Sequence, residues 1–107
     1  MQVLRWDDEP LERLSAGIGR RMLNGEALTL AQITLAAGAV VPEHEHPNEQ
    51  IATVVSGRLR FVAGGEEREV GPGESVLIPG GVPHKVVAGN RPVRALDVFH
   101  PPREDYK

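Results

Sequence analysis

The chain has 107 residues, of which 40% are hydrophobic and 25% are charged. This length allows one domain (1–107) whose core buries roughly two-thirds of the extended-chain surface. A net charge of −3 without a basic stripe argues against a nucleic-acid partner, and the lack of cysteine excludes disulfides and thiolate metal ligands. The first residues lack a signal-peptide pattern and no apolar run has membrane-spanning length, so we expect a cytoplasmic protein with no membrane partner.

Twelve glycines and nine prolines separate short apolar runs, a pattern that favours an all-β sandwich or barrel. Residues 9–16 are the one segment where we expect a helical turn. Strands are expected at 19–23, 28–36, 50–56, 58–63, 66–70, 75–78, 85–88 and 93–99.

Two local features refine this prediction. The apolar parity shifts between Leu30 and Ile33, which indicates a β-bulge near Ala31 and Gln32. The pairs at 56–57 (Ser-Gly) and 64–65 (Gly-Gly) are typical of two-residue hairpin turns.

Three of the four histidines have the spacing of metal ligands. His44 and His46 are two residues apart, and such residues of an extended segment project to the same side. Gln50 shares their parity, and His84 ends a later Pro-Gly-Gly-Val-Pro-His run. Because three neutral imidazoles and one oxygen make an open transition-metal site, we predict a metal site at these four residues.

Both histidine segments resemble the two signature motifs of the cupin family. The first is Gly-x5-His44-x-His46-x3-Gln50-x6-Gly within 38–57, and the second is Gly-x5-Pro-x-Gly-x2-His84 within 73–84. The resemblance implies a single-domain cupin β-barrel (jelly roll) that holds one metal in its mouth through His44, His46, Gln50 and His84. It also implies a homodimer.

The chain departs from the usual cupin pattern in two places. Gln50 stands where many cupins have Glu, and Ala88 stands where an asparagine often ends the second motif. Glu49 has the opposite parity, so Gln50 is the expected ligand, and Glu45 and Glu49 are expected to face solvent. A His3Gln set is neutral, so a bound divalent ion (Zn, Ni, Mn, Fe or Cu) keeps its full charge towards an anionic ligand.

The C-terminal segment 96–106 and the His-Pro-x-Glu-Gln-Ile run at 46–51 resemble the small pectin-degradation cupins, which linearise unsaturated uronate monosaccharides. In that family an Asp, a Phe and an Arg with the spacing of Asp97, Phe99 and Arg103 line the pocket beside the metal. His100 stands where a small polar residue is more usual. The resemblance implies an enzyme that converts 4,5-unsaturated uronates to linear 5-keto-4-deoxyuronate.

The chemistry of this ring opening assigns a role to each of these side chains. Asp97 is the expected general base for the anomeric hydroxyl, and the metal would stabilise the developing oxyanion. Arg103 is expected to act in catalysis and to bind the substrate carboxylate, and Phe99 to provide an apolar wall for the substrate.

Other interpretations stay open. The chain could be an iron-dependent dioxygenase, or a cupin that binds a small ligand without catalysis. The histidines could be rim or core residues without a metal. Asp97 could be an exposed strand-end carboxylate, Phe99 core packing, and Arg103 part of a solvated cluster with Glu104 and Asp105. His100 is expected at the surface, and Arg20 and Arg21 are expected to be surface charges.

Overall fold

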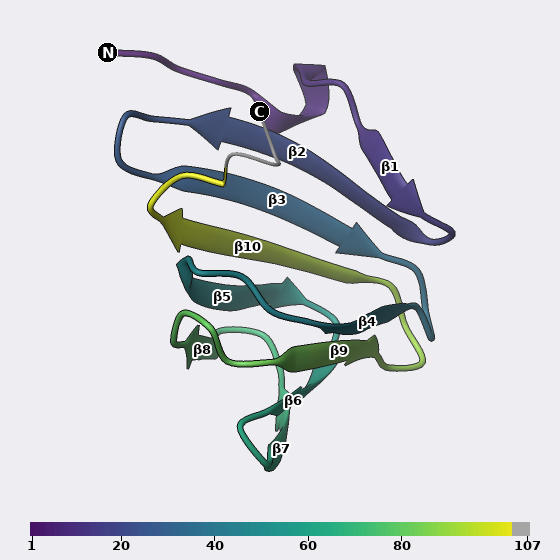
Figure 1. Cartoon of the computed structure of the whole chain (residues 1–107). Coiled ribbons are helices and arrows are strands. Elements are labelled where there is room, and N and C mark those ends of the chain that lie inside the picture. The colour runs from purple at the N-terminus through teal and green to yellow at the C-terminus, as the bar shows by residue number, and fades with distance from the viewer. Residues whose placement is uncertain (104–107) are drawn as a thin grey trace.

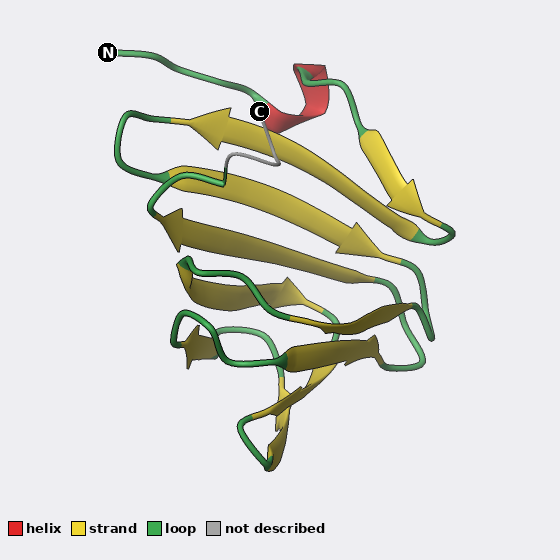
Figure 2. Cartoon of the chain, in the orientation of Figure 1, coloured by secondary structure: helices red, strands yellow, loops and turns green. Residues whose placement is uncertain are grey.

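The computed structural model of the chain describes residues 1–103, and within this range it contains strands, turns and one short 3-10 helix, η1 (Trp6–Asp8), but no α-helix (Figure 2). The strands in chain order are β1 (Glu12–Ser15), β2 (Ile18–Asn24), β3 (Thr29–Leu35), β4 (Val40–His44), β5 (Glu49–Ser56), β6 (Leu59–Ala63), β7 (Glu66–Val70), β8 (Ser75–Ile78), β9 (His84–Ala88) and β10 (Val93–His100). Among the described residues there is no helix long and apolar enough to cross a membrane.

The strands form two antiparallel sheets that face each other across one core (Figure 1). The larger sheet has the order β1-β2-β3-β10-β5-β8, and the smaller has the order β4-β9-β6-β7. Neighbouring strands in these orders are mostly not consecutive in sequence, so the chain passes repeatedly between the two layers. This is a jelly-roll arrangement, and the predicted all-β cupin-type fold is confirmed.

Side chains on the facing surfaces of the two sheets make the core. Along β3, Ala31, Ile33 and Leu35 face the core and are buried, while Leu30 and Thr34 on the other face are partly exposed. The buried hydrophobic residues are Ile18, Ala31, Ile33, Leu35, Ala52, Val54, Leu59, Phe61, Val70, Ile78, Ala88, Val93, Ala95 and Phe99.

The predicted strands all occur, with ends that differ by at most one residue. The Gly64-Gly65 hairpin is also confirmed: Ala63 pairs with Glu66, and both glycines have positive φ (+56° and +79°). A two-residue turn with two positive φ angles suits glycine, which has no Cβ to clash.

Two local predictions are wrong. Residues 9–16 contain β1, which pairs with β2, and no helical turn. Leu11 and Leu14, spaced like a helical face, are each 43% exposed; Leu14 lies on β1, the edge strand of the larger sheet, and Leu11 precedes it. The pair at 56–57 does not close a hairpin, because β5 and β6 belong to different sheets and the turn carries the chain from one layer to the other.

The predicted bulge near Ala31 and Gln32 is absent. β3 pairs residue for residue with both β2 and β10 through this region. The parity shift has another cause: Leu30 is an apolar residue on the outer face of the sheet, where it lies between Leu23 and Val98.

Candidate metal centre

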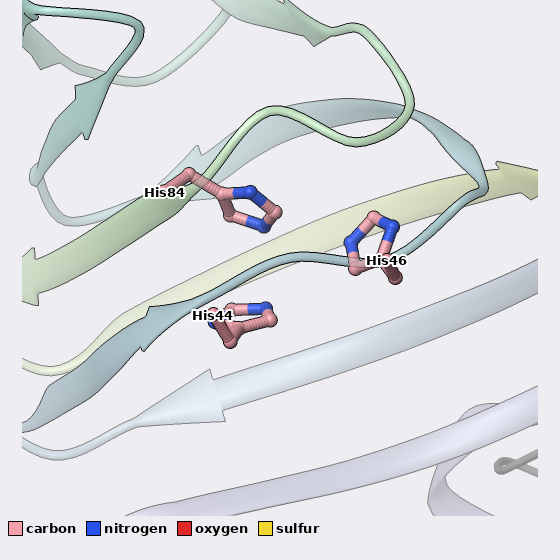
Figure 3. Close-up of side chains that lie close together, drawn as sticks. All are labelled: His44, His46 and His84. Carbon is pink, nitrogen blue, oxygen red and sulfur yellow. The ribbon is translucent and has the colours of Figure 1, made fainter.

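The three motif histidines meet at one end of the barrel. His44 ends β4, His84 begins β9 directly opposite it in the sheet, and His46 follows β4 in the connection to β5. Their rings point toward one another (Figure 3), with centroid separations of 4.3 to 5.7 Å. One nitrogen of each ring lies within 4.8 Å of the others, so the three histidines are positioned to bind one metal ion.

Each of these histidines has its Nδ1 directed at a backbone carbonyl two residues away. His44 Nδ1 lies 2.9 Å from Pro42 O, His46 Nδ1 lies 3.0 Å from Asn48 O, and His84 Nδ1 lies 2.9 Å from Val82 O. When Nδ1–H donates to these carbonyls, the lone pair is left on Nε2. The backbone therefore selects the same tautomer in all three rings and leaves Nε2 for a metal.

Gln50 is buried at the start of β5, and its two amide atoms face different partners. Gln50 Nε2 donates to Asp97 Oδ2 at 3.3 Å, and Gln50 Oε1 lies 3.1 Å from His46 Nε2. If His46 carries its proton on Nδ1, these last two atoms are both acceptors. A cation between them would turn an unfavourable contact into two ligand bonds.

His84 gives an independent test of whether a metal fits. Its ring is 2% exposed, and its Nε2 is a buried atom with no hydrogen-bond partner among the described residues. Buried polar nitrogens nearly always have a partner, so this atom fits the role of a metal ligand. The donor set, neutral imidazoles with an amide oxygen, suits a divalent transition metal.

Burial keeps two of the histidines neutral. It lowers the pKa of His84, and it lowers the pKa of His46, with a further contribution from the positive charge of Arg103. Since a metal binds the neutral imidazole, protons compete weakly for these two ligands near neutral pH.

Asp97 lies on β10, across the larger sheet from Ala52 and Ala31, with its side chain turned into the barrel. Burial raises its pKa to about 7, and the charge of Arg103 opposes this rise. The carboxyl group is therefore not an exposed strand-end carboxylate. A pKa near neutrality suits a proton-transferring group.

Phe99 and Arg103 lie next to the histidines. Phe99 is 1% exposed, and its ring centroid is 5.6 Å from that of His46. The guanidinium carbon of Arg103 lies 4.9 Å from the Phe99 ring centroid, and Arg103 is 7% exposed. Arg103 is thus buried against an aromatic ring and is not solvated, while Glu104 and Asp105 lie outside the described residues.

A cavity of about 80 Å³ connects these groups, and its lining includes His44, His84, Gln50, Asp97 and Arg103. This is well below the usual volume of a small-molecule pocket. A larger hollow of about 420 Å³ lies between β7 and β8, but no histidine lines it. We place the chemistry at the smaller cavity because the convergent polar groups are there.

Two features of the site differ from the sequence prediction or were missed by it. Arg20 was expected at the surface, but it is 7% exposed on the inner face of β2, where Nε and Nη2 donate to the carboxylate of Glu12. The inward parity of its strand neighbours Ile18 and Met22 is a signal that predicts this. Asn48 and Thr29, both buried, were not predicted to have a role.

Three surface predictions are confirmed. Glu45, Glu49 and His100 are exposed, and His100 Nδ1 donates to Ala27 O at 2.8 Å. Arg21 is partly exposed and its Nη1 donates to Gln32 Oε1.

Residues 31–99 match the cupin domain family, and this stretch contains all three histidines. The chain belongs to the cupin family. This cupin is 31% identical over 103 residues to an uncharacterised protein of Streptomyces coelicolor, covering 95% of this chain and 98% of that protein. It is 35% identical over 72 residues to dimethylsulfoniopropionate lyase DddQ of Ruegeria pomeroyi, covering 66% of this chain but only 36% of the lyase.

Among solved structures, this cupin resembles KdgF from Halomonas sp. The TM-score is 0.89 with 27% sequence identity, and the match covers 94% of each chain. The similarity extends over nearly the whole length of both proteins, so it includes the strands of both metal motifs.

Proposed function

We propose that this cupin is a metal-dependent enzyme that converts 4,5-unsaturated uronate monosaccharides to linear 5-keto-4-deoxyuronate. The observation that carries the proposal is the contact between Gln50 and Asp97: a carboxyl group with a pKa of about 7 lies beside a proposed metal ligand. The structural match to KdgF and the sequence resemblance to the pectin-degradation cupins support it.

The metal ligands in this proposal are His44, His46, Gln50 and His84. One divalent transition metal held there would act as a Lewis acid and stabilise negative charge on a substrate oxygen. The neutral ligand set leaves the ion's charge uncompensated, which favours an anionic, oxygen-rich substrate.

Asp97 is the proposed general base. It removes the proton from the anomeric hydroxyl; the C1 aldehyde forms as the bond from C1 to the ring oxygen breaks, and the bonding electrons pass to the ring oxygen. The resulting enolate then takes a proton at C4 and becomes the 5-keto group, so the reaction is an isomerisation with no other reactant. A base with a pKa near the working pH suits both the removal and the return of this proton.

Arg103 is proposed to bind the substrate carboxylate, since a guanidinium can donate two parallel hydrogen bonds to it. The Phe99 ring lies under the guanidinium of Arg103 and lines the cavity. The small cavity then holds the reacting end of the sugar, and the remainder lies across the mouth.

The test is direct. The purified protein, with its metal content verified, is incubated with an unsaturated uronate made by a polysaccharide lyase, and the absorbance of the C4–C5 double bond is followed. We expect loss of this absorbance faster than in buffer, abolished by a chelator and restored by metal. A metal-loaded protein that gives no acceleration would overturn the proposal.

The same assay separates the alternatives. A dioxygenase would lose activity without oxygen, whereas the ring opening would not. The 35% identity to a dimethylsulfoniopropionate lyase favours a second candidate, a lyase acting on that sulfonium compound, and the assay is therefore repeated with it. Binding of a uronate without turnover of any substrate would indicate a ligand-binding cupin.

We also propose that two copies pair through the outer face of the larger sheet. One apolar residue from each of five neighbouring strands forms a row in direct register, namely Leu23, Leu30, Val98, Ile51 and Leu77. Ile51 is 45% exposed and Leu77 is 60% exposed. A sheet of this width and strand length offers about 550 Å² per copy, or about 1,100 Å² for two copies, which reaches the size of a specific interface.

A further inference from the structure

The C-terminal segment after β10 is held against the barrel by hydrogen bonds to two buried polar side chains, Asn48 and Thr29. Asn48 Nδ2 donates to Pro101 O at 2.5 Å and to Pro102 O at 3.4 Å. The backbone N–H of Arg103 donates to Thr29 Oγ1 at 3.0 Å. Asn48 is 6% exposed and Thr29 is 0% exposed, so these bonds are shielded from water.

Asn48 contacts both the histidine cluster and the C-terminal segment. Its backbone carbonyl faces His46 Nδ1 at 3.0 Å and orients that ring, while its side chain holds the segment that ends in Arg103. Asn48 also lies midway between His46 and Gln50 in the chain. A single residue therefore links the proposed ligands of the metal to the proposed carboxylate-binding arginine.

The chemistry of this link is specific to an asparagine. Proline residues have no N–H, so the backbone at 101–102 offers only carbonyl acceptors and needs an external donor. The amide of Asn48 supplies two N–H donors, whereas a carboxylate at this position would offer none and would repel the two carbonyl oxygens. Thr29 Oγ1 donates to Asn24 Oδ1 at 2.6 Å, which leaves its lone pairs for the Arg103 N–H.

The hydrogen bonds of Asn48 and Thr29 to this segment affect where the Arg103 side chain lies. With its backbone fixed by Asn48 and Thr29, the guanidinium of Arg103 lies over Phe99 at the edge of the cavity that holds Asp97. Without the side chain of Asn48, the segment would lose its hydrogen bonds at Pro101 and Pro102, and the guanidinium would sample positions away from the cavity more often. Binding of a carboxylate would then pay an additional ordering cost.

We propose that Asn48 is a positioning residue that sets the affinity for an anionic substrate by holding Arg103 in place. This rests on the proposed function, in which Arg103 binds the substrate carboxylate. The substitution Asn48→Ala separates the two contacts of this residue, because it removes the amide and keeps the backbone carbonyl that orients His46.

Amide hydrogen exchange tests the tether without any substrate. In Asn48→Ala we expect the Arg103 N–H to exchange about tenfold faster or more, because one or two hydrogen bonds no longer hold the segment. Exposed Asn90→Ala is the matched control and should leave this rate unchanged. Asn48→Asp keeps the side-chain size and should show the same increase if Asn48→Ala fails to fold. An Arg103 N–H that remains as protected as in the parent protein overturns the proposal.

A double-mutant cycle then tests the coupling to substrate. Asn48→Ala should raise KM for the uronate about tenfold, with a smaller change in kcat and an unchanged metal content. In an Arg103→Ala background the same substitution should have no further effect on KM, because the group it positions is gone. An equal effect in both backgrounds would show a general structural role and overturn the inference. If no uronate is turned over, the proposed function fails, while the exchange experiment still decides whether Asn48 holds the segment.

Discussion

The side-chain amide of Gln50 lies in hydrogen-bond contact with the carboxyl group of Asp97, with 3.3 Å between Gln50 Nε2 and Asp97 Oδ2. Because the nitrogen of the amide faces Asp97, its oxygen faces the histidines, 3.1 Å from His46 Nε2. Asp97 therefore helps to orient a proposed metal ligand, and the ligand in turn fixes the proposed base. The predictions on catalysis follow from this pair.

Removing the charge of Asp97 should abolish most of the activity. In Asp97→Asn we expect kcat/KM for the uronate to fall by about 100- to 10,000-fold, the usual contribution of a general base. Metal content by elemental analysis should be unchanged, since Asp97 is not a proposed ligand. The exposed Glu49→Gln is the control and should keep full activity. An Asp97→Asn protein with more than half of the parent rate would rule out this role.

Replacing the neutral ligand by a charged one should change the pH profile. In Gln50→Glu a second carboxylate would face Asp97, and repulsion between like charges would raise the pKa of Asp97 above about 7. We expect the acidic limb of the kcat/KM profile to move to higher pH, and metal to bind more tightly. The measurement is the pH–rate profile of both proteins. A profile that stays in place, or moves to lower pH, contradicts the assigned contact.

Asp97 should also destabilise the metal-free protein at neutral and alkaline pH. The folded protein keeps the proton of Asp97 up to a pKa of about 7, whereas the unfolded chain releases it near the ordinary value of 3.8. Stability is therefore lost as the pH rises between these values, by as much as about 4 kcal/mol. Above pH 7, chelator-treated Asp97→Asn should be more stable to urea than the parent, and near pH 4 the two should be alike. Equal stability at both pH values would show that the carboxyl group is not buried.

Metal affinity should depend on pH in a way that reflects the buried histidines. Burial lowers the pKa of His46 and His84 below the ordinary 6.5, so both rings stay neutral at pH 7. We expect zinc affinity, measured by competition with a chromogenic chelator, to change little between pH 7.5 and 6.5 and to fall at lower pH, by up to about tenfold per pH unit for each ring that is protonated. A steep fall already between pH 7.5 and 6.5 would contradict this.

The sequence predicted the fold and the histidine cluster because both histidine segments resemble the cupin motifs. The ring of His84 reaches that of His44 through the pairing of β4 with β9, which this fold provides. Strand parity predicts that His46 and Gln50 project to the same side only if one strand runs through both residues. This holds only in part, because β4 ends at His44, His46 lies in the connection, and β5 begins at Glu49. The side chain of His46 is aimed by its hydrogen bond to the backbone of Asn48 instead.

The rest of the site depends on contacts between residues far apart in the chain. Nothing local to Arg103 shows that the segment after two prolines folds back over the barrel. That course depends on Asn48, more than fifty residues earlier, and on Thr29. The buried guanidinium of Arg20 likewise pairs with Glu12 on the neighbouring strand, in a segment whose sequence pattern predicts a helical turn.

The outer apolar row gives the last prediction. Leu77 is 60% exposed at the edge of the larger sheet, so Leu77→Glu should leave the fold intact while placing a charge within the proposed interface between two copies. We expect the parent protein to be a dimer by light scattering at micromolar concentration, and Leu77→Glu to be a monomer, because an unpaired charge in an apolar interface has no compensating partner. Val40→Glu is the matched control: Val40 is 44% exposed but lies on β4 of the smaller sheet, and this variant should remain a dimer. A monomeric parent protein, or equal dissociation by both substitutions, would show that the outer face of the larger sheet is not where the two copies meet.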